Sequence, residues 1–316
     1  MRRNLSKLAL LTLIALPAAA VDVNLGYYDV SYGDEGLWND ATVGAGLQFN
    51  GTEVTYPGTP WTVMAINSAE TGLQYARGTG HNDFDLLAFG DYSGLPDPAG
   101  FYSSASGTSG VWVVDSVQIV KREIWDEKSQ SLRLDFVVTN TGCEDLNKLV
   151  LMHAIDPDQD IGSTSPTYNT VNDTTATTNM VWSAGPVTKL TVAYGVCDPD
   201  TQSVGHTAWS TDPYATFADD NGATADRTMH IREKIGTLIP GESVSFSFLF
   251  VGAKTPSDAV DVYYKAVEAG ACCNDCEWTA DEIKKAWDTD AKDVSGVKAI
   301  APKSAEKTAN DLADER

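Results

Sequence analysis

The segment DPDQD at residues 156–160 has the clearest pattern of side chains that could do chemistry. It directly follows the apolar run LVLMHAI and carries carboxylates at alternate positions, on Asp156, Asp158 and Asp160. In a turning loop these carboxylates can converge, and their mutual repulsion favours a bound cation. Calcium accepts oxygen ligands in flexible number and suits an extracellular protein. The pattern therefore predicts a calcium site.

Three carboxylates do not fill a calcium shell, which usually contains about six to eight oxygen atoms. The nearby segment YNTVNDTT, which begins at Tyr168, adds amide and carboxylate oxygens. An EF-hand is excluded because Thr167 stands where that motif has its last glutamate. Two alternatives stay open, a solvated turn whose aspartates cap backbone amides and a catalytic acid pair. The predicted ligands are Asp156, Asp158, Asp160, Asn172 and Asp173.

Other acidic loops repeat this pattern in weaker form. The triplet Asp-Pro-Asp recurs at 198–200, and DTDAKD at 288–293 has similar spacing where a helix is expected to end. Either the triplet at 198–200 or the glycine-containing segment ADDNGATAD at 218–226 could hold a second ion, although ordinary turns have the same composition. The oxygen-bearing side chains of the glycine-containing segment are those of Asp219, Asp220, Asn221 and Asp226.

Histidine is the most frequent catalytic base, but no histidine here belongs to a recognisable catalytic motif. His153 lies within a predicted strand, which favours a packed side chain, whereas His81 and His206 are expected in loops. The sequence has no GxSxG or HExxH pattern. A carboxylate pair could hydrolyse glycosides, but the many acids single out no pair. The sequence therefore favours a protein without catalytic activity.

Tryptophans are the remaining candidates for ligand contact. Exposed in a row, they would favour carbohydrate binding, whereas Trp112 and Trp125 lie in predicted strands, which favours burial. The sequence alone leaves both arrangements open. The tryptophans spread over the predicted strands are Trp38, Trp61, Trp112, Trp125, Trp182 and Trp209.

The elements that position these residues are predicted to be strands. Short apolar alternations and frequent turn residues run from residue 21 to 254. Three strands, over 111–125, 132–140 and 149–155, are predicted as consecutive antiparallel neighbours that deliver DPDQD at a strand end. A further strand over 243–251 alternates serine with valine and phenylalanine, which is typical of one buried and one wetter face.

The predicted fold is all-β, a single antiparallel β-sandwich with two extended sheets, or alternatively two smaller sandwiches. Residues 21–254 form the sandwich, 255–289 a short helical segment with the cysteine cluster CCNDC, and 290–316 a disordered charged tail. The first helix is expected to have Thr255 as its cap and to end at Gly270. A second capped helix is expected from Thr279.

Residues 1–20 resemble a secretory signal peptide, with arginines, an apolar run and small residues before a cleavage site near Ala20. Export predicts oxidised cysteines. The preferred pair is Cys143 with Cys197, and CCNDC either closes a small loop or supplies a thiol that links two chains.

The chain has 22 Lys and Arg against 44 Asp and Glu, a net charge of −22. This charge argues against nucleic acid and anionic membranes as partners, and no later apolar run is long enough for membrane insertion. The sequence predicts a secreted, periplasmic or cell-surface calcium-binding protein with a structural or adhesive role, whose partners are surface polysaccharide or its own copies. A carbohydrate-binding or carbohydrate-active sandwich is the alternative, and a carboxylate-dependent hydrolase comes third.

Overall fold

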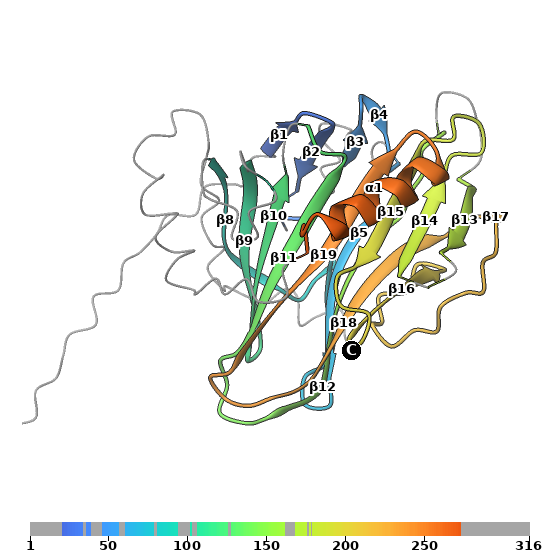
Figure 1. Cartoon of the computed structure of the whole chain (residues 1–316). Helices are drawn as coiled ribbons and strands as arrows, with labels where there is room; N and C mark the ends of the chain where they lie inside the picture. Colours follow the sequence, from blue (N-terminus) through green and yellow to red (C-terminus); the bar gives the residue numbers. More distant parts are fainter. Residues whose placement is uncertain are drawn as a thin grey trace, which may run out of the picture.

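Two large antiparallel sheets face each other across a hydrophobic core, which confirms the predicted β-sandwich (Figure 1). The computed structural model describes residues 21–33, 36–38, 46–56, 61–78, 81–93, 102, 106–125, 128–161, 168–175, 177 and 179–272. The predicted signal peptide, second helix and charged tail lie outside these residues.

The first large sheet has nine strands and carries the only helix of the described residues on its outer face. Its strands, in spatial order, are β17 (Ala223–Ala225), β13 (Thr170–Thr174), β14 (Met180–Ala184), β15 (Thr191–Val196), β19 (Ser243–Ala253), β11 (Ser131–Asn140), β10 (Val117–Trp125), β9 (Ser106–Val114) and β8 (Asp85–Ser93).

The second large sheet has six strands. In spatial order they are β16 (Gln202–Thr207), β18 (Thr228–Leu238), β12 (Leu146–Ile155), β5 (Thr62–Ser68), β6 (Gly72–Arg77) and β7 (His81–Asn82). A small third sheet packs on the core through Tyr28, whose ring lies 6.1 Å from that of Phe250. Its strands are β1 (Val21–Leu25), β2 (Tyr28–Tyr32), β3 (Leu47–Phe49) and β4 (Thr52–Glu53).

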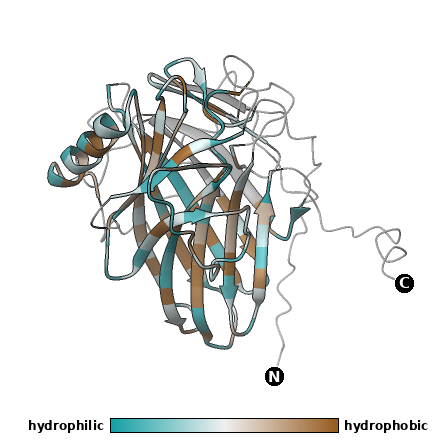
Figure 2. Cartoon of the chain, turned by 90° about the vertical axis from the view of Figure 1, so that its right-hand side faces the viewer, coloured by the Kyte–Doolittle hydropathy of each residue, from teal (hydrophilic) through white to brown (hydrophobic). Residues whose placement is uncertain are grey.

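Alternation along β11 explains how one strand serves two layers. Leu132, Leu134 and Phe136 point into the core between the sheets, as predicted. Arg133 and Asp135 point to the opposite face, where they form an ion pair of 2.7 Å and are also buried. The same alternation of apolar and polar residues is visible along the strands in Figure 2.

The helix α1 (Pro256–Glu268) covers the outer face of the nine-stranded sheet, as Figure 1 shows. The hydroxyl of Thr255 accepts a hydrogen bond from the Asp258 amide, and Gly270 ends the helix with φ +86°, which confirms the predicted bounds. Tyr263 packs on Gly195 so closely that a Cβ there would lie 2.2 Å from the ring. Glycine on β15 therefore lets the helix dock.

The single strand predicted over 111–125 is wrong. The chain turns at Asp115 and Ser116, and β9 pairs with β10 as a hairpin with Val114 opposite Val117. Asp115 has φ +48°, a left-handed conformation that aspartate tolerates better than most residues. The core-facing positions change from Trp112 and Val114 to Val117 and Ile119 across the turn. Because β9 also has valines on its other face, this change is not visible in the apolar pattern of the sequence.

The order predicted for the three strands before DPDQD is also wrong. β10 and β11 are antiparallel neighbours, but β12 crosses to the six-stranded sheet, where it pairs with β5 and β18. A hairpin and an inter-sheet crossing both give successive strands with one apolar face. The sequence pattern therefore does not distinguish them, although it does show correctly that DPDQD follows a strand.

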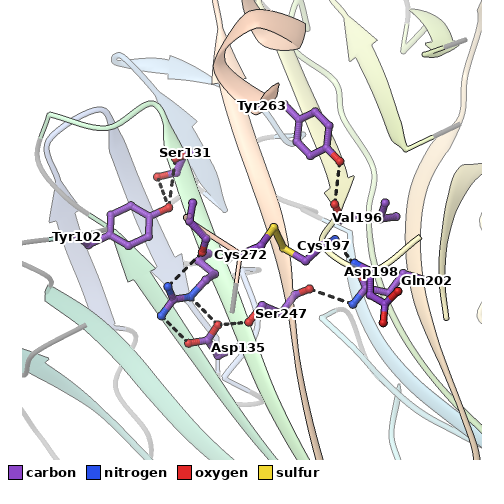
Figure 3. Close-up of a disulfide and its surroundings, with 12 residues drawn as sticks. Tyr102, Ser131, Asp135, Val196, Cys197, Asp198, Gln202, Ser247, Tyr263 and Cys272 are labelled. Carbon is purple, nitrogen blue, oxygen red and sulfur yellow. Dashed lines mark hydrogen bonds and ion pairs between the residues drawn. A yellow bond between two sulfur atoms is a disulfide. The ribbon is translucent and has the colours of Figure 1, made fainter. Parts of the chain in front are cut away.

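The disulfide joins Cys197 to Cys272, so the predicted pair of Cys143 with Cys197 is wrong (Figure 3). Val196 pairs with Phe248 on β19, whereas Thr139 pairs with Ser243, five residues away along the same strand. At about 3.3 Å per residue this offset is about 16 Å, far beyond disulfide reach. Cys143 is exposed and unpaired.

Candidate metal site

The loop that carries DPDQD is held at the end of β12 by backbone hydrogen bonds to two other segments. The Asp156 amide donates to the Trp61 carbonyl at 2.9 Å, and the Asp158 amide donates to the Val54 carbonyl at 2.6 Å. In the β12–β18 ladder Ile155 lies opposite Met229. This register brings the residues just before β18 beside the loop.

Asp156, Asp158 and Asp226 form an acidic triad, in which one carboxylate oxygen from each residue lies within 4.8 Å of the others. Asp226 comes from the segment between β17 and β18, so residues about 70 apart in sequence meet here. Asp156 and Asp158 are only 8% and 4% exposed, whereas Asp226 is half-buried. The solvent side of the acidic triad is therefore at Asp226.

One oxygen on each carboxylate of the acidic triad lacks a protein partner. Asp156, Asp158 and Asp226 each have a buried Oδ1 without a hydrogen bond. Within the described part of the chain, no lysine or arginine forms an ion pair with them. Trp209 donates from its indole nitrogen to Asp156 Oδ2 at 2.6 Å. Buried polar atoms normally find partners, so three converging carboxylates that each keep an unpartnered oxygen indicate a place for a cation or a proton.

The electrostatics agree with this geometry. Burial raises the pKa of Asp156 to about 7, while the Trp209 hydrogen bond lowers it and the charge of Asp226 raises it. Burial raises the pKa of Asp158 to about 8, and the charges of Asp156 and Asp226 add to the shift. Burial also raises the pKa of Asp226, against the charge of Arg227. Ionising all three acids is costly without a cation.

Asp160, predicted as a ligand, points away from the acidic triad. Its carboxylate accepts hydrogen bonds from the Val187 amide at 2.6 Å and from the Thr188 hydroxyl at 2.6 Å. It also lies close to Gly185, where a Cβ would approach Oδ2 to 2.7 Å. Asp160 therefore fixes the β14–β15 turn, and its oxygens are occupied.

The structure also places the other two predicted ligands elsewhere. Asn172 is fully buried, and its amide group donates to the Thr170 and Ala225 carbonyls. Its oxygen accepts from Ser183 at 2.7 Å. Asp173 accepts from the next backbone amide, that of Thr174. Only Asp156 and Asp158 of the five predicted residues join the acidic triad.

Ser183, His206 and Asp220 form a second cluster, in the order of a Ser-His-Asp catalytic triad, but a substrate has no access to it. Ser183 Oγ lies 3.2 Å from His206 Nε2, and His206 Nδ1 lies 3.7 Å from Asp220 Oδ2. Ser183 and His206 have no exposed surface, and burial lowers the pKa of His206 to about 3. A substrate cannot reach this serine. The cluster therefore joins β14 to β16 across the core.

The remaining histidines and tryptophans are mostly structural. His153 and His230 are buried in the six-stranded sheet, and His81 pairs with Asp83 at 3.0 Å. Five of the six tryptophans considered above are buried or half-buried, so they form no exposed row. Trp209 is the exception.

Three aromatic residues border the acidic triad, and the sequence drew attention to only one of them. Trp209 contacts Asp156, and it is 42% exposed. Tyr168 is 48% exposed and meets Tyr56 edge to face, with ring centroids 5.4 Å apart. The hydrogen bond with Tyr56 raises the pKa of Tyr168, and the charges of Asp158 and Asp226 add to the shift. These aromatic neighbours come from three separate segments, which no sequence spacing reveals.

No protein-family model matches the chain, and no curated protein matches it. Among solved structures, the chain resembles in part a bacterial glucoamylase solved with acarbose, at TM-score 0.48 and 10% identity over 83% of this chain and 34% of that one. A GH36 α-galactosidase from Geobacillus stearothermophilus matches at TM-score 0.38 and 10% identity over 61% of this chain and 30% of that one. A protein classed as an aldose 1-epimerase from Escherichia coli K12 matches at TM-score 0.41 and 9% identity over 75% of this chain and 99% of that one.

These proteins are named for their action on carbohydrates. The chain spans about a third of the length of the glucoamylase and the α-galactosidase. At such identities the likeness concerns the arrangement of strands alone. It carries no inference about activity, so the function is argued from the residues of the site.

Proposed function

We propose that the protein is an exported β-sandwich protein that binds a calcium ion at Asp156, Asp158 and Asp226. The observation that carries this proposal is the convergence of three carboxylates, each of which has a buried oxygen without a hydrogen-bond partner. Oxygen-only ligands favour a hard divalent cation, and calcium tolerates the irregular geometry that loop ligands offer. A bound ion would offset the repulsion among the three acids.

A catalytic acid pair is the competing explanation, because raised carboxyl pKa values are also typical of general acids. Glycosidases keep their two carboxyl groups about 5–10 Å apart so that a sugar can lie between them. Here the carboxylate oxygens lie within 4.8 Å of one another, and Asp156 and Asp158 are buried. An ion fits this spacing better than a sugar ring, so the cation explanation is favoured.

The structural role of the ion follows from the segments it would join. Asp226 precedes β18, and the DPDQD loop follows β12 and is bonded to Val54 after β4. An ion at the acidic triad would therefore fasten the segment before β18 to the DPDQD loop, which is itself bonded to Val54. The disulfide fits an oxidising compartment, where calcium is abundant. Within the described segments, no helix has the length and apolar content to cross a membrane.

Calcium titration calorimetry on chelator-treated protein tests the proposal. We expect one binding site in the wild type, an affinity at least about tenfold lower in Asp158→Asn, and an unchanged affinity in Asp173→Asn, the matched control outside the acidic triad. Asp158→Asn also removes a buried charge, so it should raise the melting temperature in chelator at pH 8 while abolishing the calcium-induced shift. Equal binding by the wild type and Asp158→Asn would overturn the proposal.

A further inference from the structure

We propose that the rim of the acidic triad binds a neutral saccharide, with vicinal hydroxyls of the sugar completing the shell of the bound cation and Trp209 and Tyr168 contacting its apolar faces. This inference rests on the proposed cation site. It adds a ligand class, and it gives a role to the aromatic side chains that surround the site.

The first supporting observation is the incomplete shell. The acidic triad offers one oxygen from each of three residues, whereas calcium takes about six to eight. Asp160 and Asn172, two of the ligands that the sequence predicts, are occupied by other hydrogen bonds. Asp156 and Asp158, the buried members of the acidic triad, each have an oxygen without a hydrogen-bond partner. The coordination positions on the solvent side, next to half-buried Asp226, remain for water or ligand hydroxyls.

The second observation is the position of the exposed aromatic residues. Of the six exposed large hydrophobic side chains in the part of the chain that the structure describes, Trp209 and Tyr168 are the two that interact with the acidic triad. Trp209 reaches Asp156, and Tyr168 lies within electrostatic reach of Asp158 and Asp226. Aromatic rings next to a few fixed polar groups are typical of small-molecule sites. The C–H faces of a pyranose ring stack on such rings while its hydroxyls reach the polar group.

The third observation is the backbone of Trp209. Its φ is +52°, a left-handed conformation that a bulky side chain rarely adopts. The other described residues that have a positive φ without being glycine are Asn50, Asp115, Lys148 and Lys189. Trp209 is therefore the only aromatic residue in this conformation in the described chain. The hydrogen bond to Asp156 holds the indole in place. A large ring kept exposed against backbone strain indicates a ligand contact.

The charge of the site favours a neutral sugar over an acidic one. The protein carries a net charge of −22, and three carboxylates around a divalent ion leave the site with a net negative charge. A uronate or sulfate group would meet this residual charge and the acidic surface around it. Hydroxyl groups have no such penalty, and a vicinal pair can occupy two positions of the calcium shell.

Binding to mannan, which is neutral and rich in vicinal hydroxyls, tests the inference, with mannopentaose as the soluble probe and alginate as the anionic comparison. We expect mannopentaose to bind in calcium and not in chelator, and alginate to bind less in the same buffer. Trp209→Ala and Tyr168→Ala should each weaken mannopentaose binding by about tenfold. Tyr168→Ala leaves the bond between Trp209 and Asp156 intact, so it tests the rim without disturbing the ion.

Tyr214→Ala is the matched control, because Tyr214 is equally exposed but bonds to Lys148 near the opposite end of β12. It should leave mannopentaose binding unchanged. Calcium binding without any saccharide binding would overturn this inference and leave the cation site standing. Failure to bind calcium would overturn the proposed function itself. Mannopentaose binding that survives chelator, or that survives both rim variants, would also overturn the inference.

Discussion

The indole nitrogen of Trp209 donates a 2.6 Å hydrogen bond to Oδ2 of Asp156 and is the only protein group found to donate to the acidic triad side chains within the described residues. This bond lowers the pKa of Asp156, in opposition to burial, which raises it to about 7. Trp209 thus favours the ionised form that a cation requires, and it keeps its own ring at the rim. This one hydrogen bond connects the carboxylates of the site to the aromatic side chains beside them.

Replacing Trp209 by phenylalanine keeps a ring but removes the donor. We expect the free energy of unfolding to fall by about 1.5–3 kcal/mol at pH 8 in chelator, the range for a hydrogen bond to a charged group. At pH 5, where Asp156 is protonated, the loss should be smaller. Denaturant unfolding at both pH values measures the difference. An equal loss at both would show that packing, rather than the bond to the carboxylate, is responsible.

The raised pKa values give the calcium-free protein a definite pH dependence. In the folded state Asp156 and Asp158 titrate at about 7 and about 8, above the ordinary aspartate value near 3.8, so the folded protein binds more protons than the unfolded chain between these limits. Stability in chelator should therefore be greatest below about pH 4 for these groups and should fall as pH rises to about 8. Melting temperatures measured in chelator across this range check the sign.

Calcium should change this dependence, because it binds the ionised acids. The calcium-induced increase in melting temperature should grow from pH 5 to pH 8. Burial also raises the pKa of Glu53 to about 7, so Glu53 contributes to the chelator curve with the same sign. The double variant Asp156→Asn, Asp158→Asn isolates the acidic triad. A calcium shift that is constant with pH in the wild type would contradict the assignment.

Asp160 should behave as a structural residue, although it shares the DPDQD motif. Asp160→Ala removes hydrogen bonds to Val187 and Thr188, and we expect a loss of about 2 kcal/mol in the free energy of unfolding. Calcium affinity should stay within about threefold of the wild type. Calorimetry and denaturant unfolding on the same variant separate the two effects. A tenfold loss of calcium affinity without loss of stability would instead make Asp160 a ligand.

The sequence predicts the fold well where one local pattern decides the structure. Alternation places Leu132, Leu134 and Phe136 on the core face of β11, and the capping hydroxyl of Thr255 starts α1 where expected. The sequence does not predict the fold where two different strand pairings would give similar apolar patterns. Valines on both faces of β9 hide the turn at Asp115, and the crossing of β12 to the other sheet gives the same apolar face as a hairpin would. Register and sheet membership depend on distant strands.

The candidate site divides in the same way. Asp156 and Asp158 are predictable because they share one short loop, and alternate side chains in that loop can point to one place. The sequence indicates Asp226 only as part of another acidic loop, because the β12–β18 register that brings it to DPDQD is not local information. Asn172 has the right chemistry, but the buried Ser183 uses its oxygen. Hydrogen-bond satisfaction, which only the fold reveals, decides which oxygens are available.

The disulfide offers a test of the fold that is independent of the ion. Cys197 directly follows β15, and Cys272 follows α1. The disulfide therefore ties the end of the helix to the sheet across a sequence separation of 75 residues. Arg133 also donates to the Ala271 carbonyl at 3.1 Å, so the same segment is held twice.

Cys272→Ser should lower the free energy of unfolding by about 2–4 kcal/mol under oxidising conditions. Cys143→Ser, at an exposed thiol, should change it by less than about 0.5 kcal/mol. Because the alternative pairing of Cys143 with Cys197 would reverse the order of these two losses, denaturant unfolding of both variants discriminates between the two topologies.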